Sequence, residues 1–337
     1  MKIKLVLVSV LAFAVLNSCV NEKTNYDYIE GFTQGTTYHI TYCTDFAKID
    51  KSEVDSILHD FDLSLSTYKP ESIISKINRN EKNILVDDYF KAVFLKSMEI
   101  SEKTNGFFDI TVSPLVNAWG FGTEKRESPD SCKIDSILKF VGYKKVRLSN
   151  DSVIKTKPEV KLDVNAIAQG YSVDVLVQYF EKRGIRNYVI EIGGELKAKG
   201  INKNGTLWRI GIDKPIDDST ATNREIQEIL LLNDKALATS GNYRKYFIKN
   251  GVKYAHTINP KTGYPVERNL LSATVLANDC MTADAYATAF MVMGLEKSIE
   301  FVENNQWLDV YLIYSDKNGN FRVYYTDNLK KMIKPAD

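Results

Sequence analysis

Hydrophobic and polar positions recur along this chain at spacings that predict strands and helices in mixed order. Residues 38–42 and 188–192 alternate as half-buried strands do, and short strands are also predicted at 142–148 and 153–156. Ile57, Leu58 and Phe61 share one face of a predicted helix. Segment 160–164 is predicted to be extended, so the middle of the chain follows a strand-helix-strand order. Helices are predicted from residue 52 onward and over 89–104, 166–183 and 282–293, with Gly184 and Gly294 as stop signals.

Three Asn-Gly pairs, at 204–205, 250–251 and 318–319, lie between alternating segments and predict hairpin turns. Because hairpins join antiparallel strands, the predicted fold class is α+β and not a doubly wound parallel sheet. No Pro-, Gly- or Ser-rich linker and no repeat divides the 337 residues. We therefore expect one large unit of two interleaved lobes over residues 31–334.

The first residues have the order of a secretory signal. Lys2 and Lys4 precede an apolar run at 5–16, which is shorter than the roughly 20 residues that span a bilayer. The run ends at Leu-Asn-Ser-Cys, which resembles a bacterial lipobox whose Cys19 is acylated, for example with palmitate. We expect a lipoprotein signal peptide at 1–18, a tether at 19–30, and a protein anchored by lipid to a membrane of the bacterial cell envelope, outside the cytoplasm. An ordinary signal peptide with a chance cysteine is the alternative.

Charge and cysteine content narrow the classes of function. The net charge of +1 gives no reason to expect nucleic acid, which is bound through a basic face. Besides Cys19, the chain has Cys43, Cys132 and Cys280, without a CxxC pair. We therefore expect neither a disulfide framework nor structural zinc, and one disulfide stays open.

Two N-terminal segments could bind a planar or phosphorylated ligand. Gln34 precedes a glycine and two threonines before a strand, so its turn could present backbone N–H groups to a phosphate or to the edge of a flavin. A simple turn is the alternative. Tyr68 lies on a loop with a following proline and could stack on a ring system.

Two acidic residues stand beside segments of unusual composition. Asp109 follows Phe107 and Phe108 in a stretch with several aromatic residues, where it could be a turn cap in a buried aromatic cluster. Asp163 precedes the small residues that open the helix at 166–183. It could hold a hydroxyl or a ring nitrogen of a ligand near the helix N-terminus, or be a plain N-cap.

His256 is one of three histidines and lies between small polar residues and a Gly/Pro loop. Pairing across the hairpin at 250–251 would bring Ser240 and Gly241 near its strand. A lone histidine is usually structural, and a catalytic role is the alternative.

Asp284 and Thr288 are four residues apart at the start of a helix, so their oxygen atoms project from one face. An acid and a hydroxyl without a nearby His or Cys suit Mg²⁺, which keeps positions for water and phosphate. The alternative is an exposed helical turn in which Thr288 bonds back to the backbone.

Taken together, these clusters resemble one family, the FAD:protein FMN transferases or ApbE lipoproteins, over nearly the whole chain after Cys19. The resemblance implies an ApbE-like (T-fold-like) α+β fold of largely antiparallel sheets packed with helices. Its segments are Ser-Thr-Tyr-x-Pro, Phe-Asp-Ile-Thr-Val-x-Pro-Leu-Val-Asn-x-Trp-Gly-Phe-Gly, Glu-Ile-Gly-Gly-Glu, Trp-Arg-Ile-Gly-Ile, Ala-Thr-Ser-Gly-Asn-Tyr-Arg and Thr-Ala-Asp-Ala-x-Ala-Thr.

The resemblance also implies roles for individual residues. The Ala166 carbonyl, Asp284 and Thr288 would hold one or two Mg²⁺ ions, and His256 and Asp284 would act in catalysis. This chain departs from the family pattern with Gln34 for Met, Val164-Asn165-Ala166 for Leu-Gly-Gly, Gln169 for a charged residue and Asn259 for Asp. FAD would contact Gln34, Tyr68, Phe107, Phe108, Asp109, Asp163, Gln169 and the backbone near Ile258.

The implied reaction is the attack of a Thr or Ser hydroxyl of an acceptor protein on the FMN-side phosphorus of FAD, with release of AMP. The resemblance points to an acceptor segment of the type Asp-Gly-x-Thr/Ser-Gly-Ala-Thr/Ser in membrane redox subunits, such as those of a sodium-pumping quinone reductase or an Rnf complex. Two alternatives are an FAD pyrophosphatase that releases FMN and AMP, and a flavin-binding lipoprotein without enzymatic activity.

Overall fold

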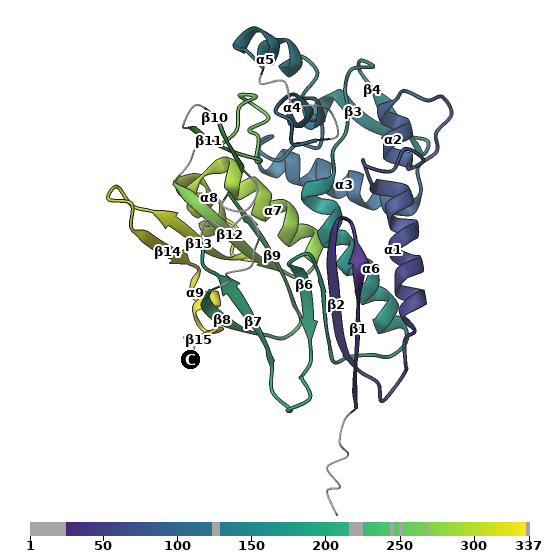
Figure 1. Ribbon diagram of the computed structural model, residues 1–337, viewed down its shortest axis with the longest axis vertical. Coiled ribbons are helices and arrows are strands. Elements are labelled where there is room, and N and C mark those ends of the chain that lie inside the picture. Colours follow the sequence, from purple (N-terminus) through teal and green to yellow (C-terminus); the bar gives the residue numbers. More distant parts are fainter. Residues whose placement is uncertain are drawn as a thin grey trace, which may run out of the picture.

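The computed structural model describes residues 25–122, 129–215, 225–242, 246–249, 252–266 and 269–334. The predicted signal peptide and Cys19 lie outside these residues. An eight-stranded sheet in the order β1-β2-β5-β6-β9-β12-β13-β14 forms the centre of the molecule, and each neighbouring pair is antiparallel (Figure 1). Its strands are β1 (Tyr26–Thr33), β2 (Thr36–Cys43), β5 (Tyr188–Ile192), β6 (Glu195–Lys199), β9 (Lys235–Gly241), β12 (Leu270–Ala277), β13 (Asp309–Ser315) and β14 (Phe321–Tyr325).

A smaller sheet covers part of one face of the large sheet. Leu196, Leu237 and Leu276 of the large sheet share a buried cluster with Trp208 and Leu230 of the smaller one. The smaller sheet has the order β15-β8-β7, and two separate hairpins are β3-β4 and β10-β11. These strands are β3 (Val146–Ser149), β4 (Ser152–Lys155), β7 (Trp208–Asp213), β8 (Ile226–Leu232), β10 (Tyr246–Lys249), β11 (Val252–Ala255) and β15 (Ile333–Lys334).

Helices pack on the large sheet, with α6 against β5 and β6 and α7 against β9 and β12. Figure 1 shows α6 and α7 near the middle of the molecule, with α1 beside β1 and β2. No helix of the described residues has the length and the apolar run needed to cross a bilayer. The helices are α1 (Lys51–Leu65), α2 (Ile73–Asn78), α3 (Asp88–Lys103), α4 (Ser113–Ala118), α5 (Ser131–Leu138), α6 (Asn165–Lys182), α7 (Cys280–Met293), α8 (Leu295–Glu303) and α9 (Asp327–Lys330), and Tyr143–Lys145 form a 3₁₀ turn.

The helix α6 joins two buried clusters of the protein. Ile167 and Ala168 belong to the cluster that also holds the apolar residues of α3 and α7, whereas Val173, Leu176 and Phe180 pack with the aromatic residues of β2 and β5. One helix thus contributes to both cores, which is the physical basis for a single folded unit. Cys43, Cys132 and Cys280 are free thiols.

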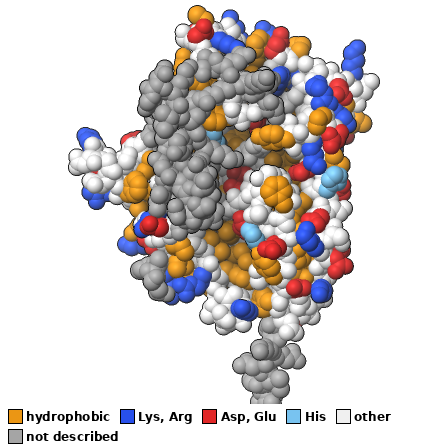
Figure 2. Space-filling view, in the orientation of Figure 1, with side chains coloured by type: hydrophobic (Ala, Val, Ile, Leu, Met, Phe, Trp, Pro, Cys, Tyr) orange, Lys and Arg blue, Asp and Glu red, His pale blue; other side chains and the backbone are white. Residues whose placement is uncertain are grey.

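Charged side chains of both signs are mixed on the surface. Figure 2 shows acidic and basic groups interspersed over the described part of one face. Some of the surface charges join separate elements: Arg183 at the end of α6 is 2.9 Å from Glu53 of α1. Exposed ion pairs of this kind contribute about 0–1 kcal/mol each, so the packing of the buried clusters is the main source of stability.

Most elements predicted from periodicity are confirmed. The long helices begin and end within about two residues of the predicted bounds, and Gly184 and Gly294 both have a φ of 82° where α6 and α7 end. Strands β10 and β11 pair across 250–251, and β13 and β14 pair across 318–319.

Four predictions differ from the structure. The predicted strand at 142–148 begins only at Val146, after the 3₁₀ turn at Tyr143–Lys145. Segment 160–164 forms no ladder, because Asn78 takes the place of a neighbouring strand: its amide bonds both the N–H and the carbonyl of Leu162, at 2.7 and 2.8 Å. The turn at 204–205 is not a hairpin, since β6 pairs with β5 and β9 while β7 pairs with β8. The sheet begins at Tyr26, so the predicted tether at 19–30 is too long; β1 pairs with β2 over its whole length.

Helices α6 and α7 approach each other closely at Gly170. A Cβ atom on this residue would lie 2.4 Å from the Cys280 carbonyl oxygen and 2.7 Å from the Asp284 Cβ. These distances are far below van der Waals contact, and the first of them is to backbone, which cannot rotate away. The packing of the two helices therefore requires glycine at this position.

We expect Gly170→Ala to lower the free energy of unfolding by roughly 1–3 kcal/mol, because the strain of the new contact outweighs the better helix propensity of alanine. Gly211→Ala is the matched control, since a Cβ there would meet the Ile226 side chain at an ordinary 3.4 Å. Guanidinium unfolding curves measure both variants. Equal stability of the two would contradict the close approach at Gly170.

Candidate active site

The carboxylate of Asp284 lies inside the protein on an apolar helix. Asp284 is 5% exposed, and the neighbouring residues Ala283, Ala285 and Ala287 of α7 are buried in the core. The Oδ2 atom accepts the Gly170 N–H at 3.0 Å, and Oδ1 has no hydrogen-bond partner among the described residues. Burial raises the pKa of this carboxyl, and the Gly170 N–H opposes the rise. The alternative of an exposed helical turn is therefore wrong, and a buried acid with an open oxygen indicates a functional group.

Thr288 lies one turn further along α7, where the surface of the helix opens. Residues 282–287 are all buried, and Thr288 is half-buried. Its Oγ1 is 3.1 Å from the Oγ of Ser240, at the end of β9. The hydroxyl of Thr288 thus points toward the end of β9 in the large sheet. Asp284 thus contacts α6 and Thr288 contacts β9, and their common face stays a prediction from the four-residue spacing.

The contacts between α6 and α7 also place Ala166. Asp174 of α6 bonds Cys280 of α7, and Gly170 of α6 bonds Asp284 of α7. Lower residue numbers of α6 are therefore paired with higher residue numbers of α7. If this progression continues for one more turn, Ala166 is expected to lie toward Thr288. The described residues contain no group of three or more His, Cys, Asp or Glu side chains that could hold a metal ion. A carboxylate, a hydroxyl and a carbonyl oxygen are nevertheless a set that fits Mg²⁺, a hard ion that needs few protein ligands.

A cavity of about 190 Å³ lies at the N-terminal end of α6. Tyr68 is 63% exposed beside it, as expected of a ring that could stack on a ligand. The Asp163 Oδ1 accepts the Asn165 N–H at 2.9 Å, so this residue supports the start of α6 and also lines the cavity. Burial raises the pKa of Asp163. The lining includes Tyr68, Asn78, Arg79, Lys161, Asp163 and Asn165.

Gln34 has an amide nitrogen that suits a ligand. The residue has a φ of 52° in the turn between β1 and β2, and its Nε2 is buried without a hydrogen-bond partner among the described residues. A buried donor that is left unpaired costs roughly 1–3 kcal/mol, so such an atom is usually paired. An acceptor atom on a bound ligand would satisfy it.

Gln169 holds the turn between β5 and β6. Its Nε2 donates to the Ile192 carbonyl at 2.9 Å and to the Glu195 Oε2 at 2.6 Å. The turn fits closely, since Gly193 has a φ of 62° and a Cβ there would lie 1.9 Å from this nitrogen. The Gly193 N–H bonds the Thr37 carbonyl at 3.0 Å, which joins the turn to β2. Both amide hydrogens of Gln169 are thus used within the protein, and only Oε1 is left to face a ligand.

The three residues from Phe107 to Asp109 differ in burial: Phe108 and Asp109 are buried, and Phe107 is half-buried. Asp109 is a turn cap: its Oδ1 accepts the N–H and the hydroxyl of Thr111 at 2.8 and 2.6 Å, and its Oδ2 accepts the Tyr143 N–H at 2.6 Å. Burial raises its pKa, and these bonds oppose the rise. Phe108 is buried, whereas the half-buried ring of Phe107 has the Nζ atoms of Lys261 and Lys297 at 4.3 and 4.6 Å from its centroid. Of this segment, the Phe107 ring is the side chain that a ligand can reach.

His256 begins a loop that is fixed on both sides. Its ring contacts that of Phe121 edge to face, with centroids 6.4 Å apart. Ile258 bridges to Pro265, and the Trp119 Nε1 donates to the Gly263 carbonyl at 2.8 Å. The expected pairing of Ser240 with the His256 strand is wrong, because Ser240 lies opposite Ala273 of β12 and the hairpin is made by β10 and β11.

Sequence reasoning did not identify three residues that shape this site. Gly170, Asp174 and Gly193 are not among the residues predicted to contact FAD or a metal ion, but they set the distances between α6, α7 and the turn after β5. A glycine inside a helix and an acid on its buried face are the signals that could have identified the first two. Gly193 has the weaker signal of a Gly-Gly pair between two strands.

Comparison with known proteins assigns these features to one group. Residues 34–312 match the model of the ApbE family. FAD:protein FMN transferases from Haemophilus influenzae and Vibrio cholerae are 37% and 36% identical to the chain; both alignments cover 97% of this chain, and 97% and 98% of the relatives.

Two solved structures have the same fold as this chain. The flavin transferase ApbE from Vibrio cholerae has a TM-score of 0.83 at 35% identity over 92% of this chain and 99% of that one. The apo flavinyl transferase ApbE from Pseudomonas stutzeri has a TM-score of 0.81 at 30% identity over 92% and 97%. The predicted α+β fold of this family is thus confirmed.

We expect Gln169→Met to lower the free energy of unfolding by roughly 1–3 kcal/mol, because methionine keeps the length of the side chain but leaves the Ile192 carbonyl without its donor. Gln178→Met is the control, since Gln178 lies on the exposed face of the same helix and should change stability by less than about 0.5 kcal/mol. Chemical unfolding compares the two. If both variants lose the same stability, Gln169 does not hold the turn.

Proposed function

The chain belongs to the ApbE family, and we propose how it acts as an FAD:protein FMN transferase. Its curated relatives carry this activity in their names and align with nearly all of the chain. The observation that carries the chemistry is the buried Asp284 carboxylate, which has one oxygen bonded to Gly170 and the other open, with the Thr288 hydroxyl one turn away. This arrangement supports phosphoryl transfer, in which positioning and charge neutralisation do most of the work.

In the proposed reaction, the hydroxyl oxygen of a Thr or Ser of the acceptor protein forms a bond to the FMN-side phosphorus of FAD. The bond between that phosphorus and the bridging oxygen breaks, and AMP leaves with the electron pair. The hydroxyl proton passes to a base of the enzyme. The products are a phosphoester between FMN and the acceptor, and AMP.

We assign the metal site to the Ala166 carbonyl, Asp284 and Thr288. These residues fit Mg²⁺ because the set is composed of oxygen donors and includes a carboxylate that lacks a second partner among the described residues. When bound, Mg²⁺ supplies positive charge to the diphosphate of FAD. Asp284 contributes the negative charge that such an ion requires, and Gly170 orients its carboxylate.

The other predicted residues have two proposed roles, the binding of FAD and the transfer of the hydroxyl proton. Tyr68 and Asp163 line the cavity at the start of α6 and would contact the flavin nucleotide. The Gln34 amide would donate to an acceptor atom of FAD, since it is buried and unpaired among the described residues. His256 is the proposed base for the acceptor hydroxyl, with Asp284 as the second candidate.

We also propose that the enzyme is a lipoprotein of the cell envelope. The charged start, the apolar run at 5–16 and the Cys that follows it support cleavage after residue 18 and a lipid on Cys19. An acceptor outside the cytoplasm, such as a membrane redox subunit, would then meet the enzyme at the same membrane. Mass spectrometry of the mature N-terminus tests the lipid on Cys19, and an unmodified cysteine would contradict it.

The transfer itself is tested with purified protein, FAD, Mg²⁺ and a peptide that contains the segment Asp-Gly-x-Thr/Ser-Gly-Ala-Thr/Ser. A transferase adds the mass of FMN less one water to the peptide and releases AMP. Free FMN with AMP, and an unlabelled peptide, would instead indicate an FAD pyrophosphatase. Unchanged FAD would indicate a binding protein. Only the first outcome supports the proposal.

We expect Asp284→Asn to lower the rate of FMN transfer by about 10²–10³-fold, because the amide keeps the shape of the carboxylate but removes its charge. Asp279→Asn is the control: it removes one charge from the same helix, but the new asparagine side chain would still cap the helix. Transfer rates and far-UV circular dichroism of both variants are compared. A folded Asp284→Asn variant that keeps more than a tenth of the wild-type rate would refute the role of this carboxylate.

Removing divalent cations tests the metal separately. We expect EDTA to stop FMN transfer and added Mg²⁺ to restore it, with an unchanged circular dichroism spectrum, because the two helices that carry the ligands are held by their own packing. The measurement is the initial rate of AMP release at increasing free Mg²⁺. A rate that is insensitive to chelation would remove Mg²⁺ from the proposal.

A further inference from the structure

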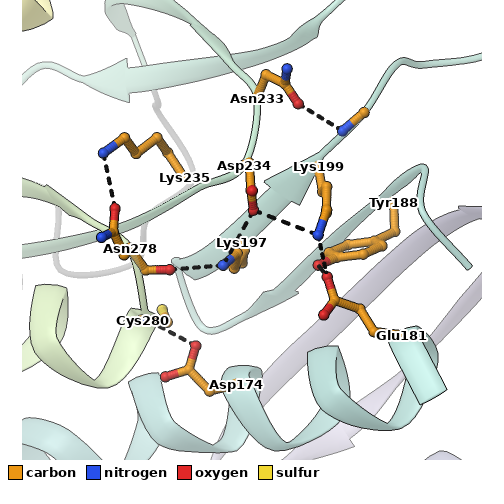
Figure 3. A network of polar contacts seen from close by, with 11 residues as sticks. Asp174, Glu181, Tyr188, Lys197, Lys199, Asn233, Asp234, Lys235, Asn278 and Cys280 are labelled. Carbon is orange, nitrogen blue, oxygen red and sulfur yellow. Dashed lines mark hydrogen bonds and ion pairs between the residues drawn. The ribbon is translucent and has the colours of Figure 1, made fainter.

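The first turn of α7 is held by a carboxylate from another helix. Asp174 of α6 is 7% exposed; its Oδ1 accepts the Cys280 N–H and its Oδ2 accepts the Met281 N–H, both at 2.8 Å. Figure 3 shows this carboxylate on α6 pointing toward the start of α7. Because two atoms of a rigid group bond two successive N–H groups, the contact restricts both the distance and the rotation of α7 relative to α6.

Capping alone does not require Asp174. Asp279 is already the N-cap of α7 and accepts the Thr282 N–H at 2.8 Å. Burial raises the pKa of Asp174 to about 7, although the two N–H groups favour its charged form. A carboxylate is costly to bury, and an exposed residue would cap the helix at a lower cost. The buried position of Asp174 therefore indicates a role in holding the two helices together.

The start of α7 is also held from the side of the sheet. Lys197 of β6 donates to the Asn278 carbonyl at 2.7 Å, and Lys235 of β9 donates to the Asn278 Oδ1 at 3.1 Å (Figure 3). Lys197 is in turn 3.5 Å from the carboxylate of Asp234. The loop before α7 is thus bonded to the sheet, while Asp174 bonds the helix itself to α6.

The contacts of Asp174 lie one helical turn from Asp284 and two turns from Ala166 and Thr288, the other proposed metal ligands. Asp174 pairs with Cys280 and Met281, and Gly170 pairs with Asp284. From this progression, the next turn is expected to bring Ala166 toward Thr288. Mg²⁺ accepts ligand oxygens only near 2.0–2.1 Å and in nearly octahedral directions. A shift of α7 along α6 by a fraction of an ångström would therefore weaken the site, since Ala166 is on one helix and Asp284 and Thr288 are on the other.

We propose that Asp174 is a positioning residue of the enzyme: it sets the register of α7 on α6 and thereby the affinity of the site formed by Ala166, Asp284 and Thr288 for a divalent cation. This inference depends on the Mg²⁺ site of the proposed function. Asp174 itself contacts neither the cation nor FAD and acts through the backbone of Cys280 and Met281.

The test compares cation binding by Asp174→Asn and Asp279→Asn, with Mn²⁺ as the probe and electron paramagnetic resonance of free Mn²⁺ as the readout. Asparagine at position 174 has only one oxygen that can accept a hydrogen bond. It can therefore bond the N–H of Cys280 or that of Met281, and its NH₂ group would lie against the N–H that is left without an acceptor. We expect the Mn²⁺ dissociation constant of Asp174→Asn to rise at least tenfold. We expect that of Asp279→Asn to stay within twofold, because this variant removes the same charge from the same helix end without changing the contact with α6.

The outcomes separate the inference from the function on which it depends. A wild-type protein that binds no Mn²⁺ would refute the metal site itself. If wild type binds and both variants weaken binding equally, the effect is one of charge at the helix end and the inference is wrong. An unchanged dissociation constant for Asp174→Asn is equally contrary to it.

A second variant and a kinetic measurement distinguish a specific effect on the metal site from a general folding defect. Asp174→Glu keeps both oxygens and the charge but is one methylene longer, so it should move α7 and also weaken Mn²⁺ binding. If Asp174→Asn does not fold, wild-type affinity in Asp174→Glu overturns the inference. In the transfer assay, the Mg²⁺ concentration for half-maximal rate should rise in either folded variant, while the KM for FAD at saturating Mg²⁺ stays within about twofold. A change of both in parallel would point to a general structural defect instead.

Discussion

The structure depends on the close approach of α6 and α7 at Gly170. Because this residue has no Cβ, the backbone of α6 reaches the Cys280 carbonyl and the side chain of Asp284, and its N–H bonds the buried carboxylate. The same contact thus packs the core and orients an ionisable group in it. Burying a carboxylate without such a bond would cost several kcal/mol. The helix packing and the chemistry of the site therefore have one common cause.

The contact at Gly170 is connected to four strands of the large sheet, β2, β5, β6 and β9, through neighbouring residues of α6. Gln169 bonds the turn between β5 and β6, and that turn bonds β2 through Gly193. On the next turn of α6, Asp174 bonds the start of α7, whose loop is bonded to β6 and β9 by lysines. One helix thus fixes the mutual positions of a strand turn, a second helix and the loop before it. Rigidity of this kind is what a phosphoryl-transfer site requires.

Sequence periodicity predicted the α+β class and most helices, because those patterns reflect which face of each element is buried. The four-residue spacing of Asp284 and Thr288 likewise predicted a shared face, since it depends on a single helix. The predictions that were wrong depended on partners distant in the sequence. Asn78 replaces a strand beside 160–164, and β9, β12 and β6 pair where a local hairpin was expected near Ser240. Asp174 contacts a helix more than 100 residues away, which no local pattern reports.

The two helices differ at their N-termini, and this difference bears on where an anionic substrate binds. The first three N–H groups of α7 are all bonded to carboxylates, two to Asp174 and one to Asp279, so this end repels a phosphate. Among the described residues, the start of α6 has a single bond of this kind, from the Asn165 N–H to Asp163, and the cavity with Tyr68 and Lys161 lies at this end. A helix N-terminus attracts negative charge when its N–H groups are open. In the proposed function, the diphosphate of FAD would therefore be placed at the start of α6, where fewer N–H groups are bonded to carboxylates than at α7.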